Sequence, residues 1–67
     1  MGIQQRLGEN IRRLRKEKGW SQEQYADEAD IHRTYVSDLE RGARNPTVLV
    51  IEKLAKPLGV EPGRLLD

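Results

Sequence analysis

The chain has 67 residues and a formal net charge of +1, with 12 basic and 11 acidic side chains. This length allows one small domain over residues 1–67 and leaves no room for a separate catalytic lobe, which excludes most classes of enzyme. The chain contains no Cys and one His, so disulfide bonds and the common protein-bound zinc sites are also excluded.

The first predicted helix is amphipathic. Its apolar residues fall at steps of four, four and three positions, as one stripe on a helix does: Ile3, Leu7, Ile11 and Leu14. Basic side chains flank this stripe. Gly19 follows as a typical stop residue, so we expect the helix to end just before it.

The second predicted helix has the sharpest start signal in the chain. Ser21, followed three residues later by Gln24, forms a capping box. Trp20 and Tyr25 occupy the two positions of a hydrophobic staple across the same helix start. Together these signals predict a helix over about 21–29.

A third helix is predicted over about 32–41, after an interruption at Asp30. Val36 and Leu39 form its inward side, and Gly42 ends it. Only three or four residues separate the second and third helices. This separation is typical of a helix-turn-helix.

A fourth helix is predicted after the loop ARNP, with Thr47 as its N-cap. Its apolar residues repeat at helical spacing: Val48, Ile51, Leu54, Ala55 and Leu58. Pro57 lies inside this pattern, so we expect it to end or kink the helix near Lys56.

A short fifth helix is predicted from Glu61 and Pro62 onward, carrying Leu65 and Leu66. No segment alternates with period two, and no internal repeat or long linker divides the chain. The predicted fold class is therefore all-α, with five short helices in one compact unit.

Leu49 and Val50 lie off the inward stripe of the fourth helix, which makes this helix apolar over a wide arc. Exposed apolar patches of this kind often mark association. We therefore expect a two-fold homodimer through the fourth and fifth helices, with Leu49, Val50, Val60 and Leu65 at the interface. The alternative is that the fifth helix covers these side chains.

The small net charge hides an uneven distribution. Basic residues dominate residues 1–20, acidic residues dominate residues 21–40, and the remainder is weakly basic. Such a pattern can form a basic face, and a phosphate backbone responds to the local face and not to the total charge. The lack of Cys, of an apolar run near residue 1 and of a membrane-length apolar segment predicts a cytoplasmic protein without a membrane partner.

One segment of the chain resembles the helix-turn-helix core of the phage-repressor and Cro-like regulators, which form the xenobiotic-response-element family. This segment is SQEQYADEADIHRTYVSDLERGARNP. IRRLRKEKGWSQ before this string and IEKLAKPLGV after it also fit, so the resemblance covers nearly the whole chain. Within the family, RTYVSDLERGARNP is most similar to the controller proteins of restriction-modification systems. The resemblance implies a lambda-repressor-like domain that binds double-stranded DNA.

In this family the third helix enters the major groove with its N-terminal residues against base edges. The resemblance places Arg33, Thr34 and Asp38 at base-reading positions, with Ser37 and His32 as flanking candidates. Arginine can donate two hydrogen bonds to one guanine, aspartate can accept a hydrogen bond from the cytosine amino group, and the threonine methyl group can contact the thymine methyl group. The alternative for Asp38 is pairing with a neighbouring arginine, which would make its base contact indirect or absent.

The resemblance also implies contacts to phosphates, which position the protein without reading sequence. The residues expected to make them are Gln22, His32, Tyr35, Arg41, Arg44, Asn45 and Arg15. Arg15 is further expected to pair with Glu40 in a partly buried bridge between the first and third helices. Asp30 stands where the family often has glycine in the turn, which predicts a modest loss of stability.

These features predict a transcriptional regulator that binds a pseudo-palindromic operator as a homodimer, with its recognition helices in major grooves about 34 Å apart. The expected partners are operator DNA and a second copy of the chain, with RNA polymerase as a further candidate. No cofactor, metal or catalytic residue is expected. The alternative function is an antitoxin-type protein-interaction module that binds DNA secondarily, and a duplex-binding assay separates the two.

Overall fold

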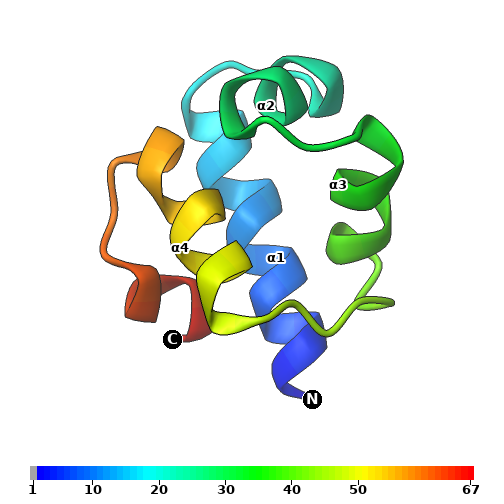
Figure 1. The fold of residues 1–67 in the computed structure, drawn as a ribbon, viewed down its shortest axis with the longest axis vertical. Coiled ribbons are helices and arrows are strands. Elements are labelled where there is room, and N and C mark those ends of the chain that lie inside the picture. The colour runs from blue at the N-terminus through cyan, green and yellow to red at the C-terminus, as the bar shows by residue number, and fades with distance from the viewer. Residues whose placement is uncertain (1) are drawn as a thin grey trace.

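The computed structural model describes residues 2–67, which form four α-helices and two short 3-10 helices. The helices are α1 (Ile3–Glu17), α2 (Gln22–Ala29), α3 (Arg33–Glu40), α4 (Val48–Ala55), η1 (Lys56–Leu58) and η2 (Pro62–Leu66). α1 runs through the middle of the molecule, with α2 across one end and α3 and α4 on opposite sides (Figure 1). Among the described residues, no helix is long and apolar enough to cross a membrane.

The predicted start of α2 is confirmed. The Ser21 hydroxyl accepts the Gln24 N–H at 3.1 Å, and the Gln24 side chain accepts the Ser21 N–H at 2.8 Å. The rings of Trp20 and Tyr25 stack with their centroids 6.2 Å apart. The Tyr25 hydroxyl donates to the Leu54 carbonyl at 2.6 Å, so α2 is also tied to α4. Burial, and then the charge of Glu40, raise the pKa of Tyr25, which keeps this hydroxyl a donor.

The turn between α2 and α3 depends on Asp30. Its backbone is left-handed, with φ 57° and ψ 49°, and it is the one non-glycine residue with positive φ among residues 2–67. The Ile31 N–H then closes the turn by donating to the Ala26 carbonyl at 2.9 Å. The structure thus confirms that aspartate occupies a conformation that glycine adopts more easily. The turn leads the chain directly into α3.

The core joins residues of every helix: Leu7, Ile11, Tyr25, Ala26, Ala29, Val36, Leu39, Leu54, Ala55, Leu58 and Leu65. The prediction that Ile3 and Val48 point inward with the other apolar residues of their helices is wrong. Ile3 is 57% exposed and Val48 is 81% exposed. Each is the first residue of its helix, before the buried residues of that helix begin.

The predicted fifth α-helix is also wrong, because η2 is a 3-10 helix and the described residues contain four α-helices. Pro62 has no N–H to donate, Gly63 is a poor helix former, and the Arg64 N–H bonds back only three residues to Glu61 at 2.9 Å. Pro57 has the expected effect on α4, which stops being α-helical at Ala55 and continues as η1.

Gly8 lies where α1 packs against the end of α3. A Cβ at this position would collide with the carbonyl oxygen of Leu39 and lie 3.0 Å from that of Glu40. Gly8→Ala should therefore lower the free energy of unfolding by about 1–3 kcal/mol, because α1 must move away from α3. Urea unfolding followed by circular dichroism measures this change. Gly63→Ala is the matched control, since a Cβ there meets nothing within 4 Å. Equal losses in the two variants would contradict this account.

Candidate nucleic-acid interface

The N-terminal end of α3 presents polar side chains to solvent. Arg33 and Thr34 are the first two residues of α3, and both are exposed. His32 is the N-cap and is exposed, and its side chain makes no capping hydrogen bond. Among residues 2–67, no hydrogen bond or ion pair engages the guanidinium of Arg33. Its donors are therefore available to a ligand.

The opposite side of α3 is buried, which fixes the direction in which the polar side chains point. Val36 and Leu39 have almost no exposed surface. Ser37 follows Thr34 by three residues, on the same helical face, and is half-buried. The predicted base-reading residues Arg33, Thr34 and Ser37 thus share one surface, while α3 is anchored from behind.

Asp38 is engaged by arginines, as the alternative predicted. Its side chain is 17% exposed and forms ion pairs with Arg41 and, at 3.2 Å, with Arg44. Desolvation alone would raise the pKa of Asp38, but hydrogen bonds from Arg41 and Arg44 outweigh it and hold the pKa below its usual value. A direct contact between Asp38 and a base would require these pairs to open.

The loop after α3 carries the predicted phosphate-binding residues Arg41, Arg44 and Asn45, all of them exposed. The guanidinium of Arg44 lies 5.1 Å from the centre of the Tyr35 ring, in a cation–π contact. The Gln4 side chain donates to the Arg44 carbonyl at 3.1 Å. The structure therefore brings these cationic side chains together at the C-terminal end of α3.

Arg15 and Glu40 form the expected bridge between α1 and α3. Nε of Arg15 lies 2.7 Å from one oxygen of Glu40, and Nη2 lies 3.0 Å from the other. Nη1 of Arg15 donates to the Trp20 carbonyl at 2.8 Å. Arg15 is only 7% exposed and all three of its nitrogens are engaged, and the phosphate contact expected of it stays a prediction. The side chain is enclosed because it spans the packed junction of α1 and α3.

Gln22 touches the same bridge from the start of α2. Its side-chain amide donates to Glu40 at 3.1 Å, and the residue is half-buried. An amide group carries two hydrogens, so one remains for a phosphate. The predicted role of Gln22 in phosphate binding stays a prediction, and the structure adds that Glu40 orients it.

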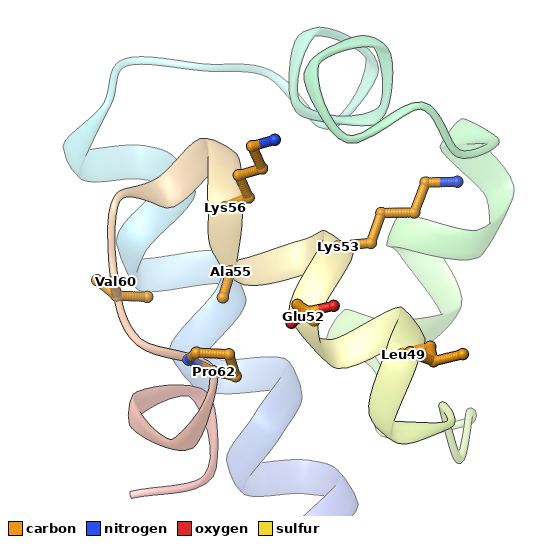
Figure 2. Close-up of a pocket in the computed structure, with 7 residues that line it drawn as sticks. All are labelled: Leu49, Glu52, Lys53, Ala55, Lys56, Val60 and Pro62. Carbon is orange, nitrogen blue, oxygen red and sulfur yellow. The ribbon is translucent and has the colours of Figure 1, made fainter.

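A second exposed surface lies along α4. Leu49 is 76% exposed, as expected from its place off the inward stripe. Figure 2 shows Leu49 and Lys53 on α4, and Val60 and Pro62 on the segment that follows η1, around a groove of about 450 Å³. Val50 and Val60 are half-buried and pack against the core. The surface is therefore partly apolar and open.

Leu65 does not belong to this exposed surface. The prediction that it contributes to a dimer interface is wrong, because it has no exposed area and lies in the core. The neighbouring backbone is held in place by Asn10 of α1, whose side-chain amide donates to the Leu65 carbonyl at 2.9 Å. η2 is thus packed onto α1 with its leucine inward.

Residues 11–65 match the helix-turn-helix family. The chain belongs to this family. It is 52% identical to the control protein C.BamHI of Bacillus amyloliquefaciens over 62 residues, which cover 91% of this chain and 76% of that protein. The resemblance to DNA-binding regulators of the helix-turn-helix type, controller proteins included, is thereby confirmed. The helix-turn-helix is formed by α2, the turn at Asp30 and α3.

Solved structures of this helix-turn-helix family have the same fold. The restriction-modification controller protein C.AhdI from Aeromonas hydrophila has a TM-score of 0.87 and 42% identity, covering 92% of this chain and 94% of that one. The biofilm regulator SinR in complex with DNA has a TM-score of 0.86 and 37% identity, covering 91% and 98%. The all-helical fold class is therefore confirmed.

Sequence analysis missed two contacts of the helix-turn-helix surface. Tyr35 and Arg44 are nine residues apart with a loop between them, so no helical periodicity pairs them. The hydrogen bond from Gln4 to the Arg44 carbonyl joins two residues that are 40 positions apart in the chain. Only the folded path of the loop brings these groups together.

Proposed function

We propose that this chain is a sequence-specific transcriptional regulator that inserts α3 into the major groove of double-stranded DNA. The observation that carries the proposal is the exposed guanidinium of Arg33 at the first position of α3, without a partner among residues 2–67. The DNA complex of SinR and the similarity to controller proteins support the same class of function. The proposed targets are restriction-modification genes.

Base reading is assigned to the start of α3. Arg33 carries the donors needed to fork onto guanine O6 and N7, and Thr34 offers a methyl group for the methyl of thymine. Ser37, on the same face, is the flanking candidate. Each good bidentate pair discriminates against the wrong base by about 1–3 kcal/mol. Asp38 is left out of this set, because Arg41 and Arg44 occupy its carboxylate.

Phosphate contacts are assigned to groups at both ends of the helix-turn-helix. The set comprises Gln22, His32, Tyr35, Arg41, Arg44 and Asn45. If about six phosphates are neutralised in each complex, log affinity falls with log salt concentration at a slope of about −5. A bound regulator either recruits RNA polymerase or blocks it, and the position of the site relative to the promoter decides which.

The proposed operator complex contains a dimer. Leu49 and Val48 are the two exposed apolar residues at the start of α4, next to the groove bounded by Val60 and Pro62. A second copy packed across this surface would bury them, and two α3 helices related by a two-fold axis would enter successive major grooves. The operator would then be pseudo-palindromic.

Leu49→Arg should raise the dissociation constant of the dimer by about tenfold or more, because it places a charge in the buried centre of the interface. Sedimentation equilibrium measures this constant. Ile3→Arg is the matched control, since Ile3 is also an exposed apolar residue but lies on α1. A monomer for the unaltered chain at micromolar concentration would rule out the dimer.

Selection of bound sites from random duplexes tests the proposed function as a whole. The expected result is an enriched site with two related halves about one helical turn apart. If the purified protein shifts no duplex at physiological salt, the regulator proposal fails and the protein-interaction module takes its place.

A further inference from the structure

Asp38 lies at the centre of a cluster of opposite charges beside the exposed face of α3. Its Oδ1 pairs with Nη2 of Arg41, and its Oδ2 accepts from Nε of Arg44 at 3.2 Å. Each carboxylate oxygen therefore serves a different guanidinium. The aspartate is largely covered, whereas the two arginines face solvent. The anion is thus shielded by cations that a phosphate can still reach.

Backbone contacts hold the same loop against the helix. Gly42 is left-handed, with φ 75°, and its N–H donates to the Leu39 carbonyl at 3.0 Å. The Ala43 N–H donates to the Asp38 carbonyl at 2.9 Å. This pair of bonds is a Schellman motif, which fixes the path of the chain as it leaves a helix. The backbone between Arg41 and Arg44 therefore has a defined course.

The side chain of Arg44 is held from several directions while donors remain free. It stacks on Tyr35, its Nε is bonded to Asp38, and Nη2 lies 3.2 Å from the same aspartate oxygen. Arginine carries five N–H donors, so the outer nitrogen keeps hydrogens for another acceptor. A side chain that is already ordered loses less entropy when it binds.

We infer that Asp38 is a positioning residue, which holds Arg41 and Arg44 for phosphate contacts and offsets part of their charge until DNA binds. This inference rests on the proposed function. In an operator complex, the two guanidinium groups held by Asp38 fit the positions of the phosphates in one alignment of the protein on the duplex. This fit compensates for the part of their charge that Asp38 offsets. On random duplex no alignment is fixed, so the reduced charge only weakens binding. Asp38 would therefore raise the ratio of operator affinity to random-duplex affinity without contacting a base.

The cluster is tested first without DNA, by an NMR titration of the Asp38 carboxyl carbon in the full chain. The two arginines hold the pKa of this group low against opposing desolvation. Arg41→Ala and Arg44→Ala should each raise the pKa of Asp38. If the pKa changes in neither variant, the cluster does not exist in solution and the inference is overturned.

The second test compares duplex binding by Asp38→Asn with that of the unaltered chain. The variant keeps the shape of the side chain and removes its charge. Affinity for a random duplex should rise about two- to fivefold, the effect of one exposed charge pair. The ratio of operator to random affinity should fall, and the preferred base at every position of the selected site should stay the same.

Two controls make this test specific. Asp27→Asn removes the same charge from an exposed position on α2 and should change random-duplex affinity less. In a chain that already carries Arg41→Ala and Arg44→Ala, Asp38→Asn should leave the ratio of operator to random-duplex affinity unchanged. A lost preference at one base pair, with unchanged random-duplex affinity, would show that Asp38 reads a base and overturn only this inference. Absence of duplex binding by the unaltered chain would overturn the proposed function as well.

Discussion

Arg33→Ala should lower operator affinity by about tenfold to a hundredfold for each half-site, because each half of the proposed complex loses one bidentate contact to guanine. Affinity for a random duplex should fall only slightly, because one exposed charge is removed from a surface that keeps its other cations. The preference at a single base pair should relax at the same time. Fluorescence anisotropy with operator and random duplexes at one fixed salt concentration measures both affinities.

Two further variants separate base reading from charge. Arg33→Lys keeps the positive charge but cannot fork onto two acceptors, so it should lose operator affinity while keeping random-duplex affinity. Arg44→Ala should weaken binding to both duplexes by similar factors, since its contact is with the backbone. Equal losses on both duplexes for Arg33→Ala would remove Arg33 from the base-reading set.

Glu40→Ala should lower the free energy of unfolding by about 3–5 kcal/mol, because it leaves the charge of Arg15 buried without its partner. The side chains of Arg15 and Glu40 are 9% and 6% exposed, so water cannot replace the lost carboxylate. A domain of this size has a total stability of only about 3–5 kcal/mol. We therefore expect a largely unfolded protein at 25 °C, as measured by circular dichroism and urea titration.

An exposed ion pair on α1 provides the matched control. Arg13 and Glu17 lie 3.6 Å apart with most of their side-chain surface in solvent, so Glu17→Ala should change stability by less than about 1 kcal/mol. The double variant Arg15→Met with Glu40→Leu should restore folding, because an apolar pair of similar size leaves no buried charge. A wild-type urea midpoint for Glu40→Ala would show that the bridge contributes nothing to stability.

Local rules were sufficient to predict the helix-turn-helix. Ser21 and Gln24 act within one turn of helix, and Gly42 stops α3 through its own backbone conformation, so neighbouring residues alone encode these boundaries. Asp30 adopts the left-handed conformation that its place in the turn requires. The exposed face of α3 also follows from local periodicity, because Val36 and Leu39 point inward and leave Arg33 and Thr34 outside, whereas the base-reading role proposed for these two residues came from the family resemblance.

The features that sequence analysis missed depend on contacts between distant elements. The burial of Leu65 requires η2 to pack on α1, and helical spacing carries no information about that contact. The bridge from Arg15 to Glu40, which lies 25 residues away, was expected from the family resemblance and not from local spacing. Pairing of Asp38 with an arginine was the stated alternative, but the loop path that brings Arg44 to it was not predicted. The fifth helix was predicted from Glu61 and Pro62 as a helix start, and this start signal does not distinguish an α-helix from a 3-10 helix over so few residues.

Glu40 has a wider consequence, because one of its oxygens is shared by Arg15 and Gln22. It is the last residue of α3, Gln22 is the first of α2, and Arg15 belongs to α1, so three helices are locked into one rigid body. In the proposed operator complex, such a rigid unit would not adjust its shape to an imperfect site. The duplex would have to bend or twist to meet it, and base steps that no side chain touches would influence occupancy through their stiffness.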